Sequence, residues 1–140
     1  MTGDARAVPV PTAVTRPFWD GTKAGELRIQ RCDDCAEHVF HPRAHCPACG
    51  SSRLGWTAVS GRARLSSYVI SDIPAPGFAD DVPYVIAIVQ LDEGPRMMTN
   101  LVNVPPDPEA LPLDLPLEVV FAPRGDQVLP LFRPAAEART

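Results

Sequence analysis

Alternating apolar and polar residues dominate the second half of the chain, which favours strands over helices there. Five such runs are separated by turns and loops rich in glycine and proline. The expected strands cover residues 57–71, 84–91, 96–104, 117–122 and 128–132. The run 84–91 is almost continuously apolar, so we expect a central strand buried on both faces. Gly61 predicts a bulge or bend in the first, long strand.

Five strands within about 77 residues, the first long and bent, fit a small closed barrel. Closure removes the unpaired strand edges that an open sheet would expose. An OB-fold agrees best with this number and length of strands. An SH3-like barrel or a small sandwich is the structural alternative. We therefore expect a mainly β protein whose C-terminal part is a five-stranded OB-fold barrel.

A short helix followed by a strand is expected before the barrel. Thr15 can cap a helix that has Pro17 in its first turn. Phe18 and Trp19 would anchor this helix by their aromatic rings. Alternation over residues 27–30 then predicts a strand that leads into a cysteine-rich segment.

Four cysteines form two closely spaced pairs, Cys32 with Cys35 and Cys46 with Cys49. The spacing is C-x2-C, ten residues, then C-x2-C. Each pair places two thiolates on one tight turn, and two such turns on a hairpin present the tetrahedron that zinc prefers. Gly50 follows the second pair, where such a turn often needs a positive φ. Ala36 follows the first pair, so we expect that turn to differ slightly.

These cysteines predict a structural metal site. Four thiolates saturate tetrahedral zinc and leave no position for water or substrate. Iron in a rubredoxin-like site is an alternative, because the same ligands accept it. A redox dithiol or disulfides are further alternatives. The three histidines lie between the cysteines, and we interpret them as surface or supporting residues because the ligand set is already complete: His38, His41 and His45.

Composition and charge narrow the class of protein. Twelve of the 17 prolines in this 140-residue chain follow Ser71, which disfavours a helical bundle there. The net charge is −4, whereas nucleic-acid binders usually carry a basic surplus, so nucleic acid is disfavoured as a partner. No apolar run approaches the roughly 20 residues that span a bilayer, and the first residues lack a signal-peptide core. We expect a cytoplasmic protein without membrane contact.

Catalytic side chains are scarce in the predicted barrel. Residues 57–140 contain no histidine, cysteine or lysine, which are the usual bases and nucleophiles. Asp72, Asp80 and Asp81 could pair as carboxylates, but acids in such a loop are more often solvated. We therefore expect no self-contained enzyme.

Alternate arginines on the first barrel strand are the best candidates for contacting a phosphate-bearing ligand. Arg62 and Arg64 share one face, and Tyr68 lies further along the strand, so together they could meet a phosphate or a pantetheine chain. The alternative is a solvated face.

The ordered motifs resemble a known family, the zinc-ribbon/OB-fold proteins associated with acyl-CoA enzymes, long catalogued as a domain of unknown function. The resemblance extends over most of the chain and is carried by the order and spacing of these segments: Pro17-Phe18-Trp19, Arg31-Cys32-Asp33-Asp34-Cys35, Phe40-His41-Pro42-Arg43, Cys46-Pro47-Ala48-Cys49-Gly50, Ser67-Tyr68-Val69, Pro83-Tyr84-Val85-Ile86-Ala87, Leu91-Asp92-Glu93-Gly94-Pro95 and Pro130-Leu131-Phe132-Arg133-Pro134.

This resemblance implies an N-terminal helical segment, a rubredoxin-like zinc ribbon and an OB-fold. The expected divisions are residues 1–30 for the arm and helix, 31–56 for the ribbon, 57–134 for the barrel and 135–140 for the tail. It also implies a partner, either a thiolase-fold enzyme or a hot-dog-fold enoyl-CoA hydratase, acting in steroid or related acyl-CoA metabolism.

The expected function is therefore that of a non-catalytic accessory subunit in a lyase- or acyltransferase-type complex, such as a thiolase-fold aldolase. It would help assembly and the binding of a CoA ester. The alternatives are a nucleic-acid-binding module and a stand-alone CoA-ester binder. Expected partner contacts are five residues of the helix and of the proline-rich loop: Phe18, Trp19, Pro74, Pro76 and Phe78.

Overall fold

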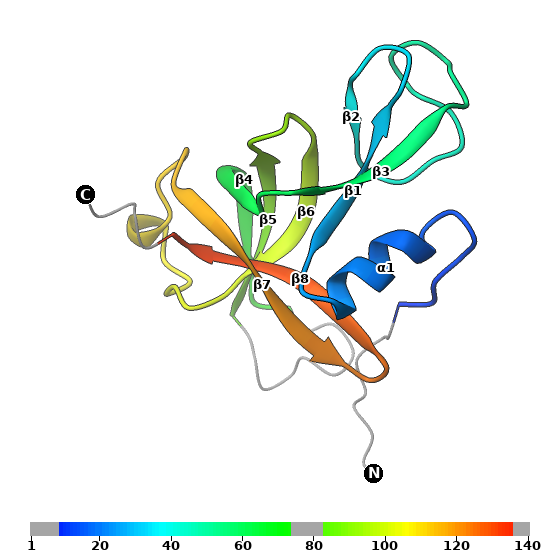
Figure 1. The fold of residues 1–140 in the computed structure, drawn as a ribbon. Coiled ribbons are helices and arrows are strands. Elements are labelled where there is room, and N and C mark those ends of the chain that lie inside the picture. The colour runs from blue at the N-terminus through cyan, green and yellow to red at the C-terminus, as the bar shows by residue number, and fades with distance from the viewer. Residues whose placement is uncertain (1–8, 74–82, 136–140) are drawn as a thin grey trace.

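The computed structural model describes residues 9–73 and 83–135, which form one short helix and two β-sheets (Figure 1). The first sheet has the strand order β2-β1-β3, and the second is a closed barrel with the order β4-β5-β6-β8-β7. The elements are α1 (Arg16–Lys23), β1 (Leu27–Cys32), β2 (His38–Val39), β3 (Leu54–Val59), β4 (Arg62–Ser71), β5 (Tyr84–Leu91), β6 (Arg96–Leu101), the 3₁₀ turn η1 (Pro108–Ala110), β7 (Pro116–Arg124) and β8 (Gln127–Pro134). The mainly β architecture with a five-stranded OB-fold barrel is thereby confirmed.

Helix α1 begins after Thr15, with proline in its first turn, as expected. The Thr15 side chain does not cap the helix; its hydroxyl lies 3.1 Å from the hydroxyl of Thr12 instead. The buried positions of α1 are Phe18, Gly21 and Thr22, which face the sheets. No helix in the described parts of the chain is long and apolar enough to cross a membrane.

The long strand expected over residues 57–71 is wrong, because the chain divides there between the two sheets. Strand β3 ends at Val59, which pairs with Leu27 of β1. Strand β4 begins at Arg62 and pairs with β5 and β7 in the barrel. Gly61 takes a φ of +78° at this division, and its carbonyl accepts a 2.8 Å hydrogen bond from the Val119 amide. One continuous strand could not join both sheets without this turn.

Strand β5 has its expected bounds but is buried on one face, so the expectation of two buried faces is wrong. Val85, Ala87, Val89 and Leu91 point into the barrel and are at most 2% exposed. The alternate residues point outward and remain at least partly accessible. The physical reason is closure, since a barrel of this size has a single interior.

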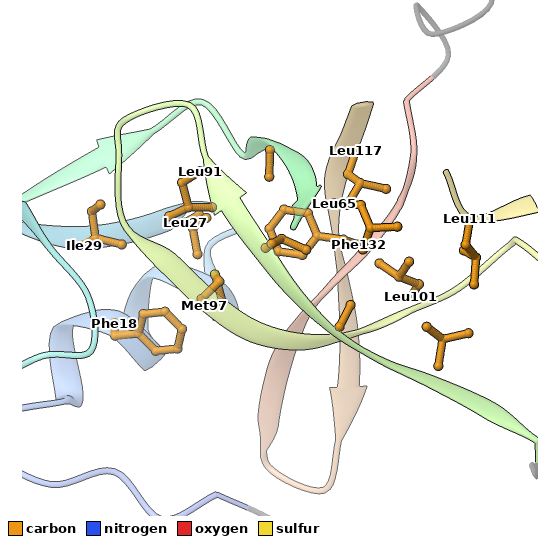
Figure 2. Close-up of a cluster of buried hydrophobic side chains, with 14 residues drawn as sticks. Phe18, Leu27, Ile29, Leu65, Leu91, Met97, Leu101, Leu111, Leu117 and Phe132 are labelled. Atoms are coloured by element: carbon orange, nitrogen blue, oxygen red, sulfur yellow. The ribbon is translucent and has the colours of Figure 1, made fainter. Parts of the chain in front are cut away.

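The apolar core of the barrel extends beyond the barrel itself (Figure 2). Phe18 of α1 and Leu27 and Ile29 of β1 belong to the same cluster of buried side chains as Leu65 and Phe132. A second, smaller cluster contains Cys32, Val39 and Cys46, with Leu54 packed against it. Helix α1 and the first half of β1 are therefore fixed to the barrel, because their apolar side chains are buried in the same core.

Candidate metal centre and adjacent surfaces

The two cysteine turns have the same backbone geometry. The Ala36 amide donates to the Cys32 carbonyl at 2.9 Å, and the Gly50 amide donates to the Cys46 carbonyl at 2.8 Å. Ala36 has a φ of 67° and Gly50 a φ of 79°, so both occupy the left-handed region. The expectation of a different first turn is wrong. Alanine accepts the same strained conformation there because the turn is needed to bring two thiols together.

The four cysteine sulfurs gather into one cluster. All four Sγ atoms lie within 4.8 Å of one another, and the Cys32–Cys49 and Cys35–Cys46 sulfurs are each 3.6 Å apart. Four sulfurs bonded to one zinc at about 2.3 Å stand about 3.8 Å apart in a tetrahedron. A disulfide needs about 2.05 Å, and all four cysteines are free thiols. The donor set and its spacing fit a tetrahedral metal ion.

Electrostatics in this cluster favour a cation. The backbone N–H of Cys35 is the largest influence on the Cys32 thiol and lowers its pKa to about 7. The backbone N–H of Glu37 lowers the pKa of Cys35, but burial and the neighbouring thiols outweigh it and raise that pKa to about 12. Four thiolates at these distances repel one another, so full ionisation requires a bound positive charge.

The histidines lie outside the cluster of potential ligand atoms. His38 is on β2 and half-buried, whereas His41 and His45 are exposed. Within the described residues, the grouped metal-binding side chains are the four cysteines alone.

A buried glutamine holds the loop that enters the second cysteine turn, and the sequence reasoning did not identify it. Gln30 of β1 is 5% exposed. Its Nε2 donates to the Arg43 carbonyl at 2.9 Å, and its Oε1 accepts from the Arg43 amide at 2.9 Å. The sequence carried no signal for this burial, because Gln30 occupies a polar position in the alternating segment LRIQ. The Gln30 side chain thus satisfies both the amide and the carbonyl of Arg43, which lies outside any strand.

The arginines and tyrosine proposed as ligand contacts do not share a face. Arg62 and Arg64 point outward and are exposed. A bulge between Leu65 and Ser67 shifts the register of β4, so Tyr68 turns inward and packs against the core. The shared face expected from simple alternation is therefore wrong, because one extra residue reverses the side-chain direction.

Of the five expected partner contacts, two lie on α1 and three lie outside the described residues. Phe18 is 5% exposed and belongs to the core, with its ring centroid 4.9 Å from that of Trp19 and 5.6 Å from that of Phe40. Trp19 is half-buried. The other three predicted contacts lie outside the described residues: Pro74, Pro76 and Phe78.

An apolar pocket of about 340 Å³ lies where α1 and residues 40–42 meet strands β6 and β8, and we call it the α1 pocket. Its walls include Trp19, Phe40 and Met98. Two polar side chains in its wall are already satisfied: the Thr99 hydroxyl donates to the Pro130 carbonyl at 3.0 Å, and the Asn100 Nδ2 donates to the Val85 carbonyl at 2.9 Å. The pocket therefore offers mainly apolar surface.

A four-cysteine ribbon followed by a closed five-stranded barrel defines the class of zinc-ribbon/OB-fold proteins. Two family models match this chain in that order. Residues 19–55 match the ChsH2 rubredoxin-like zinc ribbon domain, and residues 56–122 match the ChsH2 C-terminal OB-fold domain. The chain belongs to the ChsH2 (DUF35) family, and the resemblance stated from its motifs is confirmed.

Curated relatives fall into two groups. A "probable enoyl-CoA hydratase alpha subunit" of Thermomonospora curvata is 37% identical over 119 residues, which cover 84% of this chain and 37% of the relative. A "3-oxo-4,17-pregnadiene-20-carboxyl-CoA hydratase alpha subunit" of Mycobacterium tuberculosis is 35% identical over 94% of this chain and 41% of the relative. The chain thus spans about two-fifths of the length of these two subunits. A "DUF35 domain-containing scaffold protein" of Methanothermobacter thermautotrophicus is 35% identical over 68% of this chain and 71% of that protein.

Solved structures agree with this assignment. A chain of the "Ltp2-ChsH2(DUF35) aldolase" superposes with a TM-score of 0.80 at 32% identity, covering 92% of this chain and 100% of that one. A DUF35 protein of Sulfolobus solfataricus, with unknown function, superposes with a TM-score of 0.63 at 13% identity, covering 88% of this chain and 86% of that one. The second likeness supports the fold alone.

Proposed function

We propose that this protein is a non-catalytic accessory subunit of an acyl-CoA enzyme, and that its partner is a thiolase-fold aldolase. The observation that carries this proposal is the likeness to the aldolase chain. That chain is covered completely, at 32% identity and a TM-score of 0.80. The hydratase relatives extend well beyond the matched region, so they carry less of the argument.

The chemistry of the chain supports an accessory role. Four thiolates fill a tetrahedral metal and leave no position for a substrate or water. Residues 57–140 supply no histidine, cysteine or lysine as a base or nucleophile. The bond-breaking groups would therefore come from the partner, while this chain stabilises it and helps to hold the CoA ester.

Zinc is the proposed metal. When bound, it would be held by Cys32, Cys35, Cys46 and Cys49 and would supply folding free energy to a ribbon whose own apolar cluster is small. Metal analysis of the purified protein tests this, with one zinc per chain expected. Iron at that stoichiometry, with a reddish thiolate-to-iron absorption, would replace zinc in this proposal.

The exposed Arg62 and Arg64 are the proposed contacts for the phosphates of the CoA ester. Tyr68 is less suited to this role, because its side chain packs against the core. We expect Arg64→Ala to raise the KM of the assembled enzyme for the CoA ester while kcat changes little, since a phosphate contact is the same in the ground state and transition state. An unchanged KM would remove Arg64 from this role.

Co-expression tests the accessory role. The chain is produced together with a candidate thiolase-like protein, and the mixture is analysed by size-exclusion chromatography and an acyl-CoA cleavage assay. A stable complex whose activity depends on this chain is expected. A lone monomer that leaves the partner's activity unchanged would refute the proposal.

The two hydratase relatives favour a second candidate, in which the partner is a hot-dog-fold enoyl-CoA hydratase. The same experiment with a candidate hot-dog-fold hydratase subunit separates the two. A complex with the hydratase and none with the thiolase-like protein would select this second candidate.

A further inference from the structure

The outward side of strands β4, β5 and β6 carries apolar residues where a barrel normally shows polar ones. Val69 is 60% exposed and Met98 is 68% exposed, and between them Ile86 and Ile88 also point outward. The register places Val69 beside Ile86 and Ile88 beside Met98. These four residues, which we call the outer apolar face, therefore form one patch across three neighbouring strands.

The outer apolar face continues into the α1 pocket. Met98 belongs to both, since it points outward from β6 and also lines the pocket. Beyond Met98 the pocket wall is formed by Trp19 and Phe40, which come from the helix and from the loop before the second cysteine turn. A flat apolar patch joined to a pocket is the shape of a protein interface that receives one anchoring side chain.

Charge and composition indicate what covers this surface. Arg96 stands two residues before Met98 on the same exposed side of β6, and Gln90 lies directly across from it. Methionine, aromatic residues and arginine are the residue types enriched at the centres of protein interfaces. The patch spans three strands, about 10 Å, on the outside of a closed barrel, where its side chains do not enclose a small molecule. The fitting occupant is a protein surface with an apolar centre and a carboxylate opposite Arg96.

We propose that the outer apolar face, together with the α1 pocket, is where the enzyme partner docks, inserting one apolar side chain between α1 and β6. This inference rests on the proposed function, because it names the surface by which the accessory subunit would contact its partner. It places the contact on the barrel strands and on the walls of the α1 pocket, where Trp19 is more accessible than the 5%-exposed Phe18.

Matched variants test the docking surface. Met98→Glu and Val69→Glu place a charge on the outer apolar face, whereas Val120→Glu places the same charge on the outward side of β7, across the barrel. All three positions point away from the core. We expect the first two to weaken the complex at least about 30-fold, as the loss of an interface hot spot does. Val120→Glu is expected to bind like the wild-type chain.

The role of Arg96, which lies beside the outer apolar face, is tested separately. Arg96→Glu is expected to slow association and to reduce the salt dependence of the association rate, because the paired carboxylate would then be repelled. Hydrogen exchange on the wild-type complex gives a readout that needs no variant: peptides from residues 84–101 are expected to gain protection, and peptides from residues 116–124 are not.

The possible results distinguish the two proposals. A wild-type chain that forms no complex refutes the proposed function and this docking surface together. A complex that tolerates Met98→Glu as well as Val120→Glu, or that protects residues 116–124 instead, refutes the docking surface alone. Self-association of the isolated chain that Met98→Glu abolishes would assign the surface to a second copy and overturn the enzyme partner.

Discussion

Replacing Gly61 by alanine tests how the chain turns from the three-stranded sheet into the barrel. Gly61 is buried and has a φ of +78°, a conformation that costs an alanine about 1–2 kcal/mol. A Cβ at this position would also overlap the Cγ1 atom of Val119. Overpacking of this kind costs about 1–3 kcal/mol. We therefore expect Gly61→Ala to lower the free energy of unfolding by about 2–5 kcal/mol, the sum of these two costs.

Two controls separate the contributions. Gly25 has the same φ of +78° but open space around it, so Gly25→Ala should show the backbone cost alone. Val119→Ala removes the overlapping methyl groups, and the double variant Gly61→Ala/Val119→Ala should be more stable than the sum of the single effects predicts. Both comparisons use urea unfolding at equilibrium, with the slope checked for constancy.

The outcome that would refute this reasoning is clear. If Gly61→Ala costs no more than Gly25→Ala, the overlap with Val119 contributes nothing. If the double variant is simply additive, the two residues are not coupled. In either case the turn between β3 and β4 would not be fixed by the close approach of β7.

Further substitutions address the metal ribbon. Cys46→Ser should lose bound metal and unfold the ribbon, and retained metal stoichiometry with unchanged thermal stability would contradict the structural role of the site. Gln30→Ala should cost about 2–3 kcal/mol, because it leaves the Arg43 backbone groups without partners; the urea midpoint and faster exchange of the Arg43 amide are the measurements. Ala36→Gly should stabilise the metal-bound protein by up to about 1 kcal/mol, by relieving a left-handed alanine; a lower unfolding midpoint would show that the strain is absent.

The local features of this fold follow closely from sequence. The bounds of β5 and the start of β6 agree with the expected strands, because a continuous apolar run and the Asp-Glu-Gly-Pro turn are local signals. The metal ligands were also predictable. Two C-x2-C pairs identify all four thiols without any knowledge of the sheets, since each pair needs only one turn.

Errors arose where distant strands decide the outcome. The prediction of one strand over residues 57–71 did not account for the pairing of Val59 with Leu27 of β1, which is distant in sequence. The bulge before Ser67 directs the Tyr68 side chain toward the core. No residue type in that segment predicts the shift in register. Phe18 was expected both to anchor the helix and to contact a partner; its burial in the shared core agrees with the first role.

The sequence by itself determined the ligand set, the number of barrel strands and the absence of common catalytic groups from residues 57–140. These depend on residue identity and on spacings of a few residues. The tertiary structure decided that the chain passes from one sheet to the other at Gly61, the inward direction of Tyr68, the Gln30 contact with Arg43 and the joining of Met98 to the α1 pocket. Each of these depends on which distant strands pair and in which register, and a period of two residues along one strand carries no such information.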